Sequence, residues 1–181
     1  TIIKLDIRQG VYSFETAQSL SKVASKLGKV AKIHLKIDTG MGRVGFTPEN
    51  ASDAAEIISK LPNIEIDGIF THFAVADEYS EKSNAYTREQ YAKFYEVCEK
   101  IRQEKHINIP IRHAANSAAI LRYPEMHLDM VRAGIILYGL WPWEETKITG
   151  ADLKAVMTLK SAVSYVKEVE SGACLSYGCT Y

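Results

Sequence analysis

Basic and polar side chains recur at the ends of four successive segments that the sequence predicts to be β-strands. His72 and Ser117 each follow one of these segments, Arg43 follows another after a short loop, and Arg132 lies in the fourth. Parallel-barrel enzymes carry their chemistry at the carboxyl ends of the strands, and an arginine among core residues is rare unless it is paired. We therefore expect these side chains to meet in an active site.

A phosphate-binding site is predicted beside them. Ser117 begins a short predicted helix, and Gly134 allows the backbone to approach a ligand closely. Barrels often bind phosphate through the loops after their last two strands and through the start of a short helix. The hydroxyl group of Ser117 and the backbone amides of Gly134 and Ile135 fit that role.

A glycine-rich loop at residues 40–45 fits the pattern GxGxxG and allows two interpretations. It could bind a dinucleotide, because a strand precedes it and the acidic residues Glu65 and Asp67 lie about 20 positions further on. However, the helix signal at Thr47 comes after the third glycine, whereas the dinucleotide fingerprint places that glycine inside the helix. A simple turn would need the glycines but not Arg43 between them.

The predicted elements alternate between strands and helices along the chain. Strands are predicted at residues 11–14, 30–38, 64–73, 109–115 and 131–138, and helices at residues 16–27, 48–61, 84–105 and 117–122. Such an order implies an α/β fold with parallel strands and crossover helices. It fits either a (β/α) barrel or an open doubly wound sheet.

The character of the chain changes near residues 146–152. Residues 1–145 are expected to form the α/β domain. Residues 155–169 have an alternating pattern with many β-branched side chains, and no helical pattern follows them. We therefore expect residues 152–181 to form the start of an all-β domain. Because the chain begins at Thr1 without a methionine and ends at Tyr181 in a β-like stretch, we expect an internal fragment.

The composition excludes several classes of partner. The 181 residues include 22 basic and 22 acidic side chains and have no net charge. Nucleic-acid binding and polybasic membrane anchoring both need a basic excess, and no apolar run approaches the ~18–20 residues of a membrane span. The three cysteines form no CxxC pair, which suits a reducing cytoplasm and argues against structural zinc. We expect a cytoplasmic protein without metal, nucleic-acid or membrane partners.

Five segments also resemble the alanine racemase family, in the family's order and spacing. They are residues 34–45, 71–77, 115–119, 130–135 and 175–178. The resemblance implies a pyridoxal 5'-phosphate (PLP) enzyme of fold type III, here with a partial (β/α)8 TIM barrel followed by the start of a β domain. It also implies a homodimer that interconverts L- and D-alanine and supplies D-alanine for peptidoglycan.

The resemblance implies three residues around the reacting atoms. Tyr177 matches the tyrosine that exchanges the α-proton on the L face of the substrate, and in the family it reaches the site of the partner subunit. His72 and Arg132 match groups in a hydrogen-bonded chain behind that tyrosine. Arg132 also matches the arginine that faces the pyridine nitrogen.

Further residues match the surroundings of the cofactor and of the substrate. Those matched to the phosphate and its pocket are Ser117, Gly134, Ile135 and Asn116. Arg43 matches the arginine near the phenolic oxygen of the cofactor and the substrate carboxylate. Lys36 matches a lysine that is carbamylated in some members and helps to position Arg43.

Other functions stay open at this stage. The family's Schiff-base lysine lies on the first barrel strand, ahead of Thr1, so we expect the chain as given to be an inactive fragment. The alternatives are a serine racemase or another amino-acid racemase of the family, a decarboxylase-like enzyme of the same architecture, a non-catalytic PLP-binding barrel, and the nucleotide-binding interpretation of residues 40–45. The decarboxylases place a carboxylate at the ring nitrogen, so Arg132 disfavours them.

Overall fold

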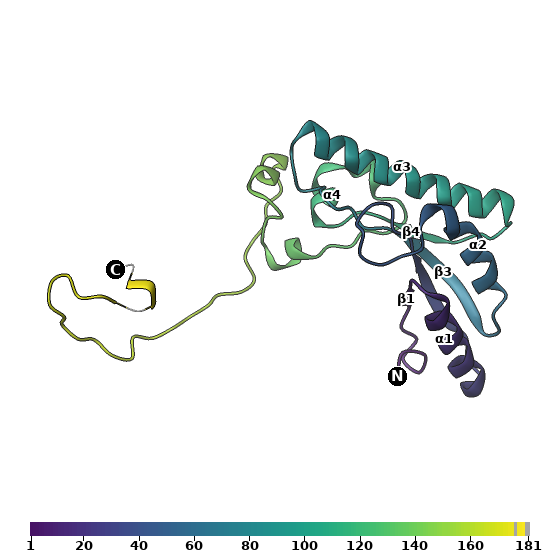
Figure 1. Ribbon diagram of the computed structural model, residues 1–181, viewed down its shortest axis with the longest axis horizontal. Coiled ribbons are helices and arrows are strands. Elements are labelled where there is room, and N and C mark those ends of the chain that lie inside the picture. Colours follow the sequence, from purple (N-terminus) through teal and green to yellow (C-terminus); the bar gives the residue numbers. More distant parts are fainter. Residues whose placement is uncertain (176, 180–181) are drawn as a thin grey trace.

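Four short strands form one parallel sheet in which each strand pairs with the next along the chain (Figure 1). They are β1 (Gln9–Val11), β2 (Ala31–Lys36), β3 (Ile64–Phe70) and β4 (Ile111–His113). The computed structural model describes residues 1–175 and 177–179. A doubly wound sheet reverses its strand order at a switch point, whereas a barrel adds every strand on the same side. The observed order therefore decides between the two predicted architectures and confirms a partial barrel.

Four α-helices follow the strands, and they begin and end close to the predicted positions. They are α1 (Phe14–Leu27), α2 (Pro48–Ser59), α3 (Glu81–Glu104) and α4 (Ser117–Arg122). The hydroxyl group of Ser13 accepts a hydrogen bond from the backbone N–H of Thr16 at 3.3 Å and so caps α1. Gly28 ends the same helix in the left-handed conformation, with φ 61°. Pro48 supplies the first residue of α2, where its fixed φ is favourable.

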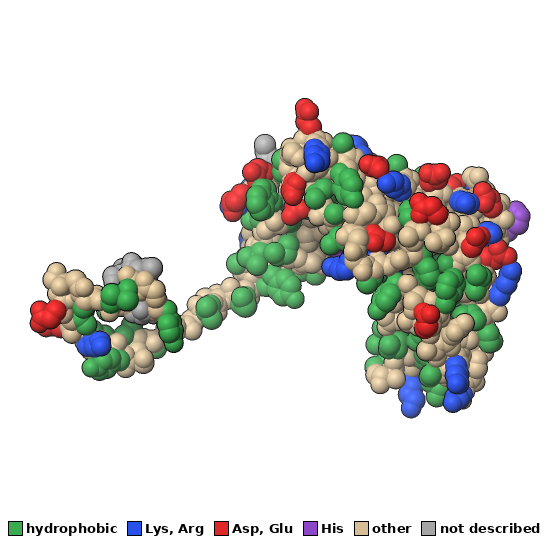
Figure 2. Space-filling model, in the orientation of Figure 1, with side chains coloured by type: hydrophobic (Ala, Val, Ile, Leu, Met, Phe, Trp, Pro, Cys, Tyr) green, Lys and Arg blue, Asp and Glu red, His purple; other side chains and the backbone are tan. Residues whose placement is uncertain are grey.

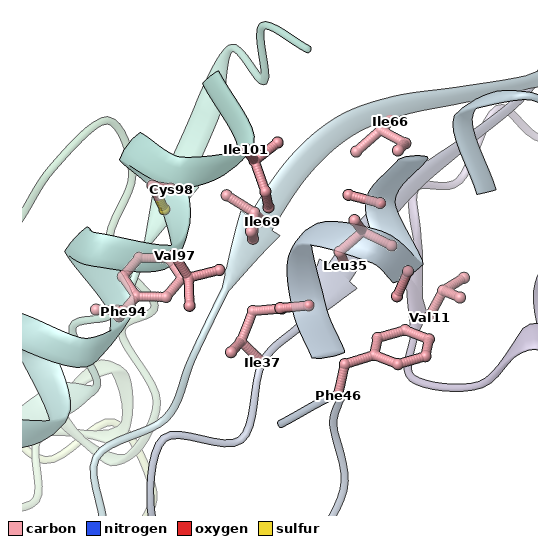
Figure 3. Close-up of a cluster of buried hydrophobic side chains, with 14 of the residues drawn as sticks. Val11, Leu35, Ile37, Phe46, Ile66, Ile69, Phe94, Val97, Cys98 and Ile101 are labelled. Atoms are coloured by element: carbon pink, nitrogen blue, oxygen red, sulfur yellow. The ribbon is translucent and has the colours of Figure 1, made fainter. Parts of the chain in front are cut away.

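The sheet has one apolar face, which the helices cover. Alternate residues of β2, Ile33 and Leu35, are fully buried and belong to one core cluster with Ile58 of α2 and Phe94 of α3. Figure 3 shows this cluster between the sheet and the helices. The intervening residues of β2 are polar, and because side chains of a strand alternate between faces, they point to the opposite side. The candidate site is built on that polar face.

The strand predicted at residues 131–138 is wrong. This segment is irregular up to Gly134, and then forms the 3-10 helix η2 (Ile135–Tyr138). Gly134 has φ −111° and ψ −101°, which is not extended. The backbone N–H of Asp129 donates to the carbonyl oxygen of Arg112 in β4, and the N–H of Arg132 donates to that of Ala115, so successive bonds are three residues apart on both segments. A regular ladder has a period of two, so the apolar run cannot continue as a strand.

No strand forms at residues 155–169 in the part of the chain that the structure describes, which differs from the prediction. The side chains of this segment are exposed, and it leaves the barrel domain as an extended tail (Figure 1). Figure 2 shows hydrophobic side chains gathered where the tail begins. The exposed hydrophobic residues of the chain include Leu137 and Trp143. A strand needs a neighbour to accept its backbone hydrogen bonds. Among the described residues, a single such bond joins this segment to a neighbour, from the N–H of Val156 to the carbonyl oxygen of Tyr138 at 3.2 Å. The β domain expected at residues 152–181 stays a prediction.

No helix among residues 1–175 and 177–179 has both the length and the apolar character to cross a membrane. The same residues hold no group of three or more histidine, cysteine, aspartate or glutamate side chains placed to bind a metal ion.

Candidate functional site

Arg132 lies at the centre of the polar face, and its guanidinium group joins the ends of β3 and β4. Its Nη2 atom donates hydrogen bonds to the carbonyl oxygens of Thr71 (2.7 Å) and Ala114 (3.0 Å), and it lies 3.3 Å from Nδ1 of His72. Its Nη1 atom lies 2.7 Å from Nδ1 of His113. The structure therefore brings together His72 and Arg132, as the sequence predicted.

Two of the five N–H groups of Arg132 are left for another acceptor. Its Nε–H and the second Nη1–H have no hydrogen-bond partner within the described part of the chain. The guanidinium also forms no ion pair with any described carboxylate. Burial lowers the pKa of Arg132 to about 10, and the group stays charged at neutral pH. A half-buried cation with free donors and no counter-ion favours an electron-rich or anionic ligand.

The imidazole group of His72 is neutral in this environment. Burial is the largest cause that lowers its pKa to about 4, and the positive charges of Arg132, Arg43 and Lys36 add to the effect. At neutral pH the ring therefore offers one N–H donor and one lone pair. It can pass a hydrogen bond between Arg132 and a group on its other side.

Lys36 and Arg43 lie in different environments. The Lys36 side chain is buried; its Nζ atom donates a hydrogen bond to the carbonyl oxygen of Ile37 at 2.7 Å, and burial lowers its pKa to about 8. Arg43 lies in the exposed loop and makes no hydrogen bond or ion pair with the described residues. Its charge nevertheless lowers the pKa of both Lys36 and His72. Arg43 is therefore near enough for its charge to act on both groups, although it does not line the hollow described below, and its pairing with Lys36 stays a prediction.

The glycine loop is not arranged for a nucleotide. The carboxylate of Asp38 accepts the backbone N–H groups of Gly40 (3.1 Å) and Gly42 (3.0 Å), which are the donors that a phosphate would need. Its negative charge would also repel a phosphate group. At Gly45, φ is 137° and an added Cβ would lie 2.6 Å from the backbone nitrogen of Asp38. The glycines therefore serve a tight turn, and the α2 helix begins only at Pro48.

The residues predicted to bind phosphate line a common hollow of about 370 Å³, within the size range of ligand pockets. The predicted residues in its wall are His72, Asn116, Ser117, Arg132, Gly134 and Ile135. The hydroxyl oxygen of Ser117 accepts the backbone N–H of Gly134 at 2.9 Å, which leaves its own O–H free to donate. An added Cβ at Gly134 would lie 3.4 Å from that oxygen. A methyl group would therefore touch the Ser117 hydroxyl group without a clash.

Asn116 has a structural task as well as a place in the wall. Its side-chain oxygen accepts the backbone N–H of Ala119 at 3.1 Å and caps α4, and its Nδ2 atom donates to the carbonyl oxygen of Phe73 at 3.4 Å. Both polar ends of the amide are therefore used within the protein. Its contribution to the hollow is to hold Ser117 at the start of α4.

Tyr177 is not brought to these residues. It lies in the 3-10 helix η4 (Tyr177–Cys179) at the end of the tail, and its side chain is 99% exposed. Figure 1 shows this segment away from the barrel domain. The predicted role of Tyr177 at a partner subunit's site stays a prediction.

Gln90 of α3 is a site residue that the sequence reasoning missed. It is fully buried; its Nε2 atom donates to the carbonyl oxygen of His72 at 3.3 Å, and its side-chain oxygen accepts the backbone N–H of Ala74 at 3.0 Å. It therefore fixes the strand end that carries His72. A signal was present, because Gln90 occupies the same helical stripe as the buried residues Phe94 and Val97.

Comparisons with known proteins point to one family. The family model described as "Alanine racemase, N-terminal domain" matches residues 1–142. The chain is 50% identical over 179 residues to an alanine racemase of Clostridium tetani and 49% identical over 181 residues to one of Methanococcus maripaludis. The match to the Clostridium tetani protein includes 98% of this chain and 45% of that protein. The match to the Methanococcus maripaludis protein includes 99% of this chain and 48% of that protein. The chain thus spans about half the length of these curated relatives.

Solved structures agree with the fold. The chain superposes on an alanine racemase of Clostridium difficile 630 with a TM-score of 0.86 and 42% identity, covering 99% of this chain and 46% of that one. An alanine racemase from a D-cycloserine-producing Streptomyces lavendulae gives a TM-score of 0.87 with 33% identity over 99% of this chain and 47% of that one.

Proposed function

Because the chain belongs to the alanine racemase family, we propose that the intact protein uses PLP to interconvert L- and D-alanine as a homodimer in the cytoplasm, and that it supplies D-alanine for peptidoglycan. The observation that carries the proposal is the state of Arg132. This half-buried cation has two free N–H donors and forms no ion pair with any described carboxylate, and it lies beside a hollow lined by Ser117 and Gly134. PLP has an acceptor nitrogen in its ring and an anionic phosphate, so its chemistry fits both features.

The residues in the wall divide the binding of PLP between them. The free O–H of Ser117 and the backbone amide of Ile135 would hold the phosphate beside Gly134, whose own N–H is bonded to Ser117, and Arg132 would donate to the ring nitrogen. PLP, when bound, supplies an electron-withdrawing ring that stabilises the negative charge left when alanine loses its α-proton. No lysine lies among the described residues of this wall, so the covalent attachment of PLP needs a group other than these.

Arg132 sets the protonation of the ring nitrogen. A guanidinium group has no lone pair for accepting a hydrogen bond and does not give up its proton near neutral pH. Arg132 would therefore donate to the nitrogen without protonating it, and an unprotonated ring would limit side reactions such as transamination. His72, held by Gln90 at its backbone, would join Arg132 to the proposed proton acceptor, Tyr177 of the partner subunit.

Arg43 and Lys36 complete the proposal at the substrate side. Arg43 is exposed, and its positive charge would bind the alanine carboxylate. The lowered pKa of Lys36, about 8, leaves part of the amine neutral near neutral pH. A neutral amine reacts with CO2 to give a carbamate and a released proton. The carbamate anion would then be an ion-pair partner for Arg43.

The test measures D-alanine formed from L-alanine by the intact protein with added PLP, with L-serine assayed in parallel. We expect D-alanine to accumulate to the racemic equilibrium, faster than D-serine does. Ser117→Ala should weaken PLP binding, whereas Ser59→Ala, at the exposed end of α2, should leave it unchanged. Turnover of serine alone would assign the protein to another amino-acid racemase of the family. Tight PLP binding with no turnover of either amino acid would support a non-catalytic barrel.

A further inference from the structure

A row of polar side chains crosses the sheet behind Arg132 and has no role in the proposed function above. We propose that Asp67, His34 and His113 form a relay of positioning residues that fixes which nitrogen of each imidazole carries its proton and so holds Arg132 in place as a donor. The hydrogen bonds of the relay lie wholly within this chain and do not depend on the proposed function. Only the effect of the relay on a bound cofactor rests on that function.

The relay is continuous from β4 to β2. Nδ1 of His113 lies 2.7 Å from Nη1 of Arg132, and Nε2 of His113 lies 2.8 Å from Nδ1 of His34. Nε2 of His34 lies 4.0 Å from the carboxylate oxygen Oδ2 of Asp67. The same oxygen accepts a hydrogen bond from Nε of Arg8 at 2.7 Å. Both imidazoles are buried, so water does not readily replace these partners.

The direction of every hydrogen bond follows from Arg132. A guanidinium group can only donate, so Nδ1 of His113 must accept and the proton of that ring must be on Nε2. That N–H then donates to Nδ1 of His34, which leaves the proton of His34 on Nε2. The His34 N–H finally points to the negative charge of Asp67, although 4.0 Å is too long for a hydrogen bond.

The same atom is an exception among the buried polar groups. Nε2 of His34 is one of two buried side-chain nitrogen or oxygen atoms without a hydrogen-bond partner among the described residues. Its N–H is therefore oriented by the charge of Asp67 alone. Without that charge, only the donation from Arg132 at the other end of the row opposes the other tautomer of His34, in which the proton moves to Nδ1.

The opposite tautomers would release Arg132. If His34 carried its proton on Nδ1, it would donate to Nε2 of His113, and the proton of His113 would move to Nδ1. That N–H would then face an N–H of Arg132, and two donors cannot bond to each other. The guanidinium group would have to turn away from His113. Asp67 therefore acts on Arg132 through two neutral rings.

The sheet is shaped to hold this row. The register between β2 and β3 shifts between Ile33 and His34, so Asp67 has no partner residue in the pairing. Such a bulge re-aims a side chain, here toward His34. A Cβ on Gly68 would lie 2.7 Å from the ring of His34, so only glycine leaves room for that ring. Phe70 stacks on His113, with ring centroids 4.9 Å apart and an angle of 4°.

Both rings are neutral at physiological pH. Burial is the largest cause that lowers the pKa of His113 to about 3, and the charges of Arg132 and His34 add to it. Burial is also the largest cause that lowers the pKa of His34; the charge of Arg8 lowers it further, and the charge of Asp67 raises it in part. No other charged group on the packed elements is found to act on either ring. The relay therefore works by tautomers and not by charge transfer.

The experiment reads the tautomers by ¹⁵N NMR of histidine-labelled intact protein without PLP. We expect His34 and His113 to carry their protons on Nε2. In Asp67→Asn the ratio of the Nε2–H to the Nδ1–H form of both rings should fall together, by on the order of tenfold, and the pKa of His34 should fall further. Glu65→Gln, an exposed carboxylate two residues earlier in β3, should change neither value.

Two results would overturn the relay. One is a proton on Nδ1 of either ring in the unmodified protein, which needs no variant to fold. The other is an Asp67→Asn protein whose tautomers and His34 titration both match those of the unmodified protein. Because these measurements use no PLP and no activity, they are distinct from the test of the proposed function. An inactive protein with both protons on Nε2 would refute the racemase and support the relay.

Discussion

Replacing Arg132 by glutamate gives the sharpest test of the site, because it exchanges five donors for a carboxylate. In the intact protein, a glutamic acid at this position would share its proton with the ring nitrogen of PLP instead of only donating to it. The removal of one charged donor from an active site costs about 10²–10³-fold in rate. We expect racemisation by Arg132→Glu to fall by about that factor.

The side reaction should change in the opposite direction. A protonated ring withdraws more electron density, so more of the alanine should transfer its amino group to PLP and leave as pyruvate. Pyruvate formed per D-alanine formed is therefore expected to rise, and lactate dehydrogenase can measure the pyruvate. This opposite movement of two products separates a change of protonation from a general loss of the site.

The same change also has a cost in stability that the structure defines. The carbonyl oxygens of Thr71 and Ala114 would lose the donor Nη2 of Arg132. A buried acceptor without a partner costs about 1–3 kcal/mol, so the free energy of unfolding should fall by about 2–6 kcal/mol for the two. Urea unfolding of the PLP-free protein measures this term separately from catalysis.

Lys22→Glu is the matched control for a reversal of charge, since Lys22 lies on the exposed side of α1. It should change neither the rates nor the free energy of unfolding by a measurable amount. If Arg132→Glu racemised alanine at the unmodified rate and formed no additional pyruvate, the role assigned to Arg132 would be refuted.

Three further predictions follow from other parts of the molecule. Tyr177→Phe should abolish exchange of the α-proton of L-alanine with solvent deuterium while PLP binding is retained, and an equal loss of PLP binding would instead give Tyr177 a structural role. Burial lowers the pKa of Lys36 to about 8 in the folded state, so the unfolded chain binds more protons than the folded protein above that pH. The free energy of unfolding should therefore rise between about pH 8 and pH 10, and this rise should be smaller in Lys36→Met. With ¹³C-labelled bicarbonate, the unmodified protein should give a carbamate signal that Lys36→Met lacks. Phe94→Ala in the core should lower the free energy of unfolding by about 3–5 kcal/mol in urea, whereas Tyr95→Ala, at an exposed neighbouring position, should have little effect.

The sequence predicted the elements that carry strong local signals. The strand that became β2 alternates clearly, and α4 is capped by Asn116 and ends before Pro124, so their positions were confirmed within two residues. The run at residues 131–138 has the composition of a strand, but its path depends on the backbone of Gly134, which composition does not reveal. At residues 155–169 the pattern was also β-like. Pairing depends on a neighbour that local sequence cannot supply.

In the candidate site, too, some residues were predicted from local sequence and others could not be. His72 and Ser117 were predicted from their places at strand ends, and Arg132 and Gly134 from a strand that does not form, yet the structure brings all four together. The relay could not be predicted in the same way, because it depends on register. The alternation of β2 already placed His34 on the polar face with Lys36. Its partner His113 lies 79 residues away, and only the pairing of three strands joins them.

Asp67 shows why a pattern of residue types is not sufficient to assign a role. In the sequence, its distance from the glycine loop made it, with Glu65, part of a possible dinucleotide-binding pattern. In the structure, the shift in register between β2 and β3 turns it toward His34, and Arg8 holds it there at 2.7 Å. One extra residue in one strand therefore decides whether this carboxylate faces a ligand or supports a histidine. The loop geometry excludes the nucleotide-binding interpretation that drew attention to Asp67. The structure instead places Asp67 at the end of the polar row that leads to Arg132.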